Sequence, residues 1–192
     1  MSSFKSAHRE QPTTTNLKFT GGTLKGRKII APHSSVTHPM GARERLALFN
    51  SLQSDLPGAT VLDAFAGTGA LGLEALSRGA AHATFIEKHH LAAATLRQNI
   101  TSLGLSAQTT LVENSVENFQ SDHKFDLIFA DPPYDKISTS ALVHLASFLA
   151  PAGQLLISHP ADFNLAEFAK QANLQLRPTK VYAAARLTIA FF

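Results

Sequence analysis

The feature that most restricts how this chain can fold is a glycine-rich segment between an apolar run and an amphipathic one. Residues 60–65 are expected to form a buried strand, and the G-x-G-x-x-G spacing of Gly67, Gly69 and Gly72 follows it directly. The apolar side of residues 70–79 then predicts a helix. Glycine lets the backbone approach a ligand closely and lets a helix pack tightly on a strand. The sequence therefore predicts the first βα unit of a nucleotide-binding fold.

After residue 59 the chain alternates short apolar runs with longer helical patterns. The expected strands are 60–65, 82–87, 108–112, 125–130 and 154–158, and the expected helices are 70–79, 89–103, 115–120, 138–149 and 165–172. Two final strands, 174–182 and 185–191, are separated by too little chain for a crossover helix, so we expect an antiparallel hairpin. This alternation is typical of an α/β fold with a mostly parallel sheet wrapped by helices.

Length and composition limit the class of protein. The chain has 192 residues, of which 44% are hydrophobic and 16% charged, which favours one compact globular domain with an extension. It contains no cysteine, which excludes disulfides, thiolate catalysis and cysteine-ligated zinc or iron–sulfur sites. No apolar run approaches the roughly 18 residues of a membrane span, and the polar start lacks a signal-peptide core. We therefore expect a cytoplasmic protein with no membrane segment, and we assign no metal.

Positive charge is concentrated near the N-terminus. Residues 1–58 contain eight lysines and arginines against three acidic residues, whereas the remainder contains nine against eleven. Such a basic segment suits a nucleic-acid phosphate backbone, and a solvated basic leader is the alternative. We expect a flexible polar leader over 1–16, a basic extension over 17–58 with a small hairpin and an amphipathic helix, and a catalytic domain over 59–192.

An acidic residue completes the pattern begun by the glycine turn. Glu87 lies twenty residues beyond Gly67, at the end of the second expected strand, where a carboxylate can bind ribose hydroxyls. The spacing predicts a site for a nucleoside-containing cofactor, with a purely structural turn as the alternative. By itself this pattern does not separate dinucleotides from S-adenosylmethionine.

The segment Asp131-Pro132-Pro133-Tyr134 follows the expected strand 125–130, at the sheet edge where ligands bind in open α/β folds. The prolines restrict the loop, so that Asp131 and the carbonyl of Pro132 have a defined relation. Two fixed acceptors beside an aromatic ring suit the binding of both N–H groups of a base's exocyclic amine, with Tyr134 stacked on the base. Methyl transfer needs that amine's lone pair localised and aimed, which these hydrogen bonds achieve. A merely rigid turn is the alternative.

These two motifs resemble those of the class I S-adenosylmethionine-dependent amino-methyltransferases. The resemblance is closer to the RsmD-like family of 16S ribosomal RNA guanine-N2 methyltransferases, and it also rests on residues 21–28, 43–50 and 70–79. It covers about residues 17–190. The resemblance implies a Rossmann-like, seven-stranded, mostly parallel sheet with an antiparallel last strand, preceded by a short hairpin and helix.

The resemblance also implies roles for individual residues. The methionine end of S-adenosylmethionine would contact Asp63 and the glycine turn, its ribose Glu87, and its adenine Ser115 and Val116. The full expected cofactor set is Asp63, Phe65, Ala66, Gly67, Thr68, Gly69, Glu87, Lys88, Ser115 and Val116, the catalytic set is Asp131, Pro132, Pro133 and Tyr134, and the RNA-binding set is Lys25, Arg27, Lys28, His38, Arg43 and Arg45. Two positions depart from the family pattern: His38-Pro39-Met40 replaces Arg-Pro-Thr, and Ser115 replaces an acid near the adenine.

The sequence thus predicts a monomeric enzyme that methylates the N2 amine of a guanine in 16S ribosomal RNA or the assembling small subunit. An adenine-N6 methyltransferase acting on DNA or RNA is the alternative within the class. A nicotinamide-dependent oxidoreductase would use the glycine turn and Glu87 but leaves Asp131 to Tyr134 unexplained. A catalytically silent RNA-binding factor is the third hypothesis, based on the basic extension.

Overall fold

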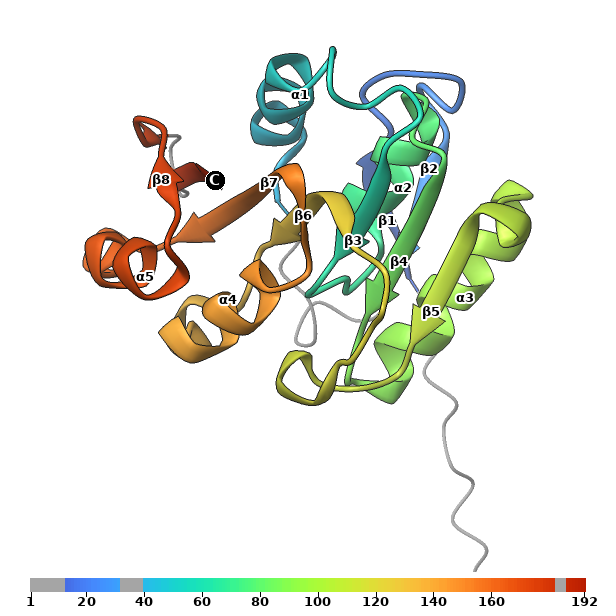
Figure 1. Ribbon diagram of the computed structural model, residues 1–192. Coiled ribbons are helices and arrows are strands. Elements are labelled where there is room, and N and C mark those ends of the chain that lie inside the picture. The colour runs from blue at the N-terminus through green and yellow to red at the C-terminus, as the bar shows by residue number, and fades with distance from the viewer. Residues whose placement is uncertain (1–12, 32–39, 182–185) are drawn as a thin grey trace, which may run out of the picture.

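The computed structural model describes residues 13–31, 40–181 and 186–192, arranged around one twisted sheet (Figure 1). The sheet order is β5-β4-β3-β6-β7-β10-β8, and β9 also pairs with β10. Its strands are β3 (Thr60–Asp63), β4 (His82–Ile86), β5 (Thr109–Val112), β6 (Phe125–Ala130), β7 (Leu149–His159), β8 (Gln175–Leu176), β9 (Lys180–Val181) and β10 (Arg186–Phe191). The strands from β3 to β7 pair in parallel, and β10 is antiparallel to β7, β8 and β9. The predicted α/β class and the antiparallel C-terminal pairing are confirmed.

The expected strand over 174–182 is broken into the two short pieces β8 and β9. Pro178 lies between them and has no backbone N–H to donate. The Arg177 N–H still donates to the Ile189 carbonyl at 2.8 Å, so the chain continues along β10 through the break. The two pieces therefore share one edge position, and the eight described strands of this sheet occupy seven positions.

The helices lie where their patterns predicted, with one exception. They are α1 (Ala42–Ser51), α2 (Ala70–Ser77), α3 (His90–Leu103), α4 (Thr139–Ala146) and α5 (Leu165–Ala172), with single 3-10 turns η1 (Ser106–Gln108), η2 (Val116–Asn118) and η3 (Tyr134–Lys136). The helix expected over 115–120 is wrong, because only η2 forms there and Phe119 is already extended. A single turn between polar residues gains too little burial to offset the cost of starting an α-helix.

Alternate residues along the parallel strands supply two separate cores. One face buries Val61, Phe85 and Phe129 against α2, α3 and the N-terminal segment, and the other buries Leu62 and Ile128 against α4 and α5. Figure 1 shows α4 and α5 beside β6 and β7, and α3 beside β5. Burial on both faces explains why these strands are near-continuous apolar runs.

The N-terminal extension packs on the sheet domain. Strands β1 (Thr13–Lys18) and β2 (Lys28–Ala31) form the expected hairpin, with Thr13 and Thr14 paired opposite Ala31 and Ile30. Side chains of the hairpin and of α1, including Phe19, Ile29 and Phe49, lie in the same core as α2 and α3. Strand β1 begins at Thr13, inside the segment 1–16 that was expected to be a flexible leader, and the flexibility of that segment stays a prediction. Within the described ranges, the helices are too short or too polar to cross a membrane.

Candidate active site

The glycine turn has the geometry that its spacing predicted. Gly67 and Gly69 have φ angles of 52° and 79°, in the left-handed region that favours glycine. A Cβ atom at Gly69 would lie 2.3 Å from Leu96 Cδ1, and one at Gly72 would lie 2.3 Å from Phe85 Cε1. Gly69 therefore permits the turn, and Gly72 permits close packing of α2 on β4.

Two carboxylates accept hydrogen bonds from the backbone of this turn. Asp63, which ends β3 and is 2% exposed, accepts a hydrogen bond from the Gly72 N–H at 2.9 Å through Oδ2. Glu87, just after β4, accepts from the Gly67 N–H at 2.8 Å and from the His89 N–H at 2.7 Å. The sequence placed both acids beside a cofactor but did not reveal that they also fix the backbone of the loop.

Burial makes Asp63 an unusual acid. Burial above all, together with the carboxylates of Asp131 and Glu87, raises the pKa of the Asp63 carboxyl to about 7, against the opposing hydrogen bond from Gly72. Three acids from the ends of β3, β4 and β6 thus interact at one edge of the sheet. Such a site favours a ligand that carries positive charge.

The other predicted cofactor residues lie in the loops at this same edge. Ala66 donates its N–H to the Ile86 carbonyl at 3.0 Å, and Glu87 donates its own to Val112 at 3.1 Å, which joins the ends of β3, β4 and β5. Ser115 precedes η2. Hydrogen bonds from the backbone of Glu117 and from the Ser115 side chain lower the pKa of the Glu117 carboxyl, as does the charge of Lys88. Phe65 and Ser115 are half-buried, Ala66, Thr68 and Val116 are buried, and Lys88 is exposed.

The segment from Asp131 to Tyr134 leaves β6 at the same edge. Pro132 is buried, Pro133 is exposed, and Tyr134 begins η3 with 36% of its surface exposed. Burial raises the pKa of Asp131, and a hydrogen bond with Ser158 opposes that rise. The Tyr134 hydroxyl also contacts Ser158, 2.9 Å from its Oγ. The four predicted catalytic residues are therefore next to the glycine turn, and Ser158 is a residue that the sequence patterns missed.

The predicted RNA-binding residues divide into three groups. Lys25, Arg27, Lys28 and Arg43 are exposed, as a phosphate contact requires. The guanidinium of Arg27 also donates to the Ser102 carbonyl at 3.1 Å. His38 lies outside the described residues, so its role stays a prediction.

The prediction that Arg45 contacts RNA is wrong. Arg45 is 1% exposed, and its guanidinium donates to the carbonyls of Met40, at 3.1 Å, and Lys18. Its Nε lies 3.8 Å from Oε2 of Glu74, which is fully buried. Arg45 shares the inward face of α1 with Leu48 and Phe49, and a buried carboxylate needs a cation there. Helical spacing from those apolar neighbours was the signal that could have revealed it.

Glu74 is the centre of a further buried network that the sequence did not reveal. Its carboxylate accepts from the backbone N–H groups of Thr20 and Gly21, at 2.8 Å from the latter, and from Nε of Arg78 at 3.0 Å. On α3, Asn99 accepts from the Ile30 N–H at 3.0 Å and donates to the carbonyls of Ile30 and Thr68 at 2.9 and 3.1 Å. These side chains bind the extension to α2 and to the glycine turn.

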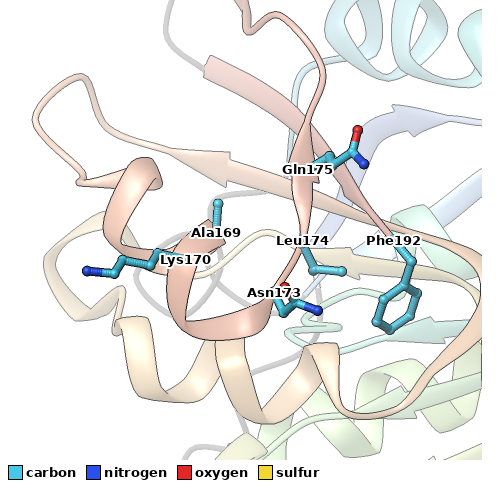
Figure 2. A pocket seen from close by; sticks show the side chains of 6 residues that line it. All are labelled: Ala169, Lys170, Asn173, Leu174, Gln175 and Phe192. Carbon is cyan, nitrogen blue, oxygen red and sulfur yellow. The ribbon is translucent and has the colours of Figure 1, made fainter.

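Two other features of the described residues bear on the site. No group of three or more His, Asp or Glu side chains among them could hold a metal ion. A shallow hollow beside α5 and the C-terminal end of the chain contains none of the predicted site residues (Figure 2). Its lining consists of Ala169, Lys170, Asn173, Leu174, Gln175 and Phe192.

The strand order, the glycine turn after β3 and the Asp-Pro-Pro-Tyr segment after β6 define a Rossmann-like methyltransferase of class I. A family model described as "Conserved hypothetical protein 95" matches residues 17–190. The chain belongs to that family, the RsmD-like methyltransferases that its motifs resemble.

Individual relatives agree with this assignment. The Escherichia coli (strain K12) protein "Ribosomal RNA small subunit methyltransferase D" is 38% identical over 120 residues, which are 62% of this chain and 60% of that protein. The Bacillus subtilis (strain 168) protein "Putative rRNA methyltransferase YlbH" is 30% identical over 159 residues, which are 79% of this chain and 86% of that protein. The solved structure of a hypothetical protein from Thermus thermophilus, TTHA0928, is 30% identical, with a TM-score of 0.77, and the match covers 91% of this chain and 99% of that one.

Proposed function

We propose that this protein transfers a methyl group from S-adenosyl-L-methionine to the exocyclic N2 amine of a guanine in 16S ribosomal RNA. The observation that carries the proposal is the placement of Asp131 and Tyr134, hydrogen-bonded to one serine, beside a glycine turn flanked by carboxylates. Kinship with proteins named as small-subunit ribosomal RNA methyltransferases supports the RNA substrate.

The residues present fit this cofactor. Because Gly67 and Gly69 have no side chain, a ligand can approach the backbone of the left-handed turn closely. The interacting acids Asp63 and Glu87 suit a cationic ligand. We assign the methionine end to Asp63 and the turn, the ribose to Glu87, and the adenine to Ser115 and Val116. S-adenosylmethionine supplies an electrophilic methyl group bound to a positively charged sulfur. Phe65, Ala66, Thr68 and Lys88 complete the proposed binding set.

The amine of guanine is a weak nucleophile because its lone pair is delocalised into the ring. In the proposed mechanism the Asp131 carboxylate and the Pro132 carbonyl accept its two hydrogen bonds, and Tyr134 stacks on the base. This arrangement localises the lone pair and aims it at the methyl group. As the C–N bond forms and the bond between the methyl carbon and sulfur breaks, the nitrogen would become acidic, and Asp131 would accept its proton. Pro133 keeps the loop rigid.

The target base must leave its stack to reach this edge, because a stacked amine cannot enter a site at the end of a sheet. We propose that Lys25, Arg27, Lys28 and Arg43 neutralise phosphates of the surrounding RNA. In this division of labour the extension over 17–58 contacts RNA, and residues 59–192 bind the cofactor and the base. With a ribosomal substrate, the protein would act in the cytoplasm, as a monomer.

The variant Asp131→Ala tests the chemistry separately from binding. We expect it to lose methyl transfer by a factor of about 100 or more, since an oriented hydrogen-bond acceptor in a reacting site contributes on that scale. Its binding of S-adenosylhomocysteine and of ribosomal RNA should change little, as measured by calorimetry and filter binding. An Asp131→Ala variant that transfers methyl groups normally contradicts the proposed role, and binding of NADH without S-adenosylhomocysteine would favour an oxidoreductase.

A further inference from the structure

A buried serine lies between the two residues that the proposed function brings into contact with the base. Ser158 is on β7, and only 2% of it is exposed. The parallel pairing of β6 with β7 places Ala130 opposite Ile157. Asp131, the first residue after β6, therefore lies beside Ser158, which is still within β7 and pairs with Leu187 of β10 on its other side.

The Ser158 hydroxyl lies between both residues. Its Oγ is 2.9 Å from the Tyr134 hydroxyl oxygen, the register of β6 and β7 sets it beside Asp131, and a hydrogen bond from it lowers the pKa of the Asp131 carboxyl. A serine hydroxyl has one proton to donate and can accept through its lone pairs. When Asp131 is ionised, Ser158 must donate to it and accept from Tyr134. The direction of both hydrogen bonds is then fixed: Tyr134 donates to Ser158, and Ser158 donates to Asp131.

We propose that Ser158 is a positioning residue for methyl transfer, which holds the Asp131 carboxylate and the Tyr134 ring in one hydrogen-bonded chain. The inference rests on the proposed function, because it concerns the two side chains assigned to the base. Ser158 acts through them and does not itself need to touch the substrate.

The first consequence concerns the charge of Asp131. Burial favours its neutral form, whereas a hydrogen bond donated to the carboxylate favours the ionised form. The ionised form is the one that accepts hydrogen bonds from an amine, since a protonated oxygen would present a donor to a donor. Ser158 therefore keeps Asp131 in the reactive form at a lower pH than burial alone would allow.

The second consequence concerns Tyr134, whose ring is partly exposed. A tyrosine hydroxyl bound at a fixed point restricts where the ring can lie. A ring already in place costs less entropy when a base stacks on it. The Ser158 hydroxyl thus positions both the Asp131 carboxylate, which accepts from the amine, and the Tyr134 ring, which stacks on the base.

The titratable groups near Asp131 and Ser158 include two further acids and a histidine. Asp63, at the end of β3, interacts electrostatically with Asp131, and Glu87 after β4 interacts with Asp63. His159 follows Ser158 on β7, but its ring nitrogens are bonded to the Pro160 carbonyl at 2.8 Å and to Thr188 Oγ1 at 3.0 Å. The charges of Asp131 and Glu87 raise the pKa of Asp63, whereas the neutral form of Asp131 itself is favoured mainly by burial, which the hydrogen bond from Ser158 opposes.

The pH dependence of methyl transfer tests the proposal. The measurement is kcat/KM on ribosomal RNA between about pH 5 and 9. In Ser158→Ala we expect the acidic limb of this profile to move to a pH about one unit higher, because the loss of one hydrogen bond to a charged group changes a pKa by about that much. Tyr134→Phe keeps the ring and should move the limb in the same direction by less. The double variant should match Ser158→Ala, because Tyr134 acts on Asp131 through Ser158. Ser158→Thr, which restores the hydroxyl, should restore the limb.

Thr188→Val is the matched control, because it removes another buried hydroxyl, one bonded to His159. It should leave the limb in place. A second readout needs no substrate: carboxyl-carbon NMR should show a higher pKa for Asp131 in Ser158→Ala than in the wild type.

Three results would decide against the proposal in different ways. An unmoved limb together with an unmoved Asp131 pKa in Ser158→Ala overturns it while the proposed function stands. If Ser158→Ala does not fold, an unmoved limb in Tyr134→Phe, whose altered group is on a partly exposed side chain, overturns it. If the wild-type protein methylates no RNA, the proposed function fails and the role of Ser158 fails with it.

Discussion

At the scale of single residues, Asp63 shows how one position can serve a ligand at the expense of stability. It is buried among other acids, and its carboxyl is held by the Gly72 N–H at 2.9 Å. Burial makes ionisation costly in the folded chain, while the unfolded chain ionises this group freely. A cationic cofactor reverses the balance by favouring the carboxylate. The residue is therefore expected to be stabilising for the complex and destabilising for the free protein near neutral pH.

The stability of the free protein should accordingly depend on pH. The folded pKa of Asp63 is about 7 and its ordinary value is 3.8, so the folded state binds the proton more tightly. The contribution of Asp63 to the free energy of unfolding has its full value below about pH 4. It is lost as the pH rises towards 7, a change of roughly 4 kcal/mol. Asp63→Asn keeps an oxygen for Gly72 and does not titrate. The free energy of unfolding of the wild type minus that of Asp63→Asn should fall between about pH 4 and 7.5 in urea titrations, and a constant difference would show that the pKa of Asp63 is not raised.

At the scale of elements, α1 presents two arginines with opposite roles. Arg43 is exposed on its outer side, whereas Arg45 lies against Glu74 on the inner side. Removing Arg45 takes one of two arginines away from the buried Glu74 carboxylate, which keeps its ion pair with Arg78, and leaves the carbonyls of Met40 and Lys18 without this donor, which together typically costs a few kcal/mol. An exposed arginine contributes little to folding and can neutralise a phosphate.

The two variants should therefore behave in opposite ways. Arg45→Ala is expected to lower the free energy of unfolding by about 3 kcal/mol and to leave the salt dependence of RNA binding unchanged. Arg43→Ala should leave stability within about 0.5 kcal/mol and reduce the slope of log K against log salt by about 1. Urea unfolding and filter binding at several salt concentrations measure both. A reduced salt slope in Arg45→Ala, with normal stability, would return that residue to the RNA interface.

The same elements show what sequence reasoning could reach. Local patterns predicted β3, the glycine turn, α2 and the Asp-Pro-Pro-Tyr segment, because each depends on residues close together in the chain. Ser158 could not be predicted in this way, since its role depends on the register between β6 and β7. Arg45 was misassigned because the resemblance placed it near the RNA without regard to the face of α1 on which it lies. The short turn η2 fell below the length at which helical periodicity is informative.

At the scale of the whole molecule, the basic extension and the glycine turn are parts of one packed body. Glu74 binds the backbone at Thr20 and Gly21, and Asn99 joins Ile30 of β2 to the carbonyl of Thr68 in the turn. The contacts of Glu74 and the bond from Asn99 to Ile30 link segments more than 50 residues apart, which no local pattern could have shown. They place exposed basic residues and the cofactor edge on a common framework, as a methyltransferase acting on a large RNA requires.

The identity of the methylated nucleoside is the measurement that decides the proposed function. Small ribosomal subunits, naked ribosomal RNA and DNA would each be incubated with the protein and labelled S-adenosylmethionine, digested to nucleosides and separated. We predict N2-methylguanosine from the ribosomal substrates and none when Asp131→Ala replaces the wild type. N6-methyladenosine would contradict the guanine assignment and move the protein to the adenine branch of its class, while no transfer to any substrate would favour an RNA-binding factor without catalysis.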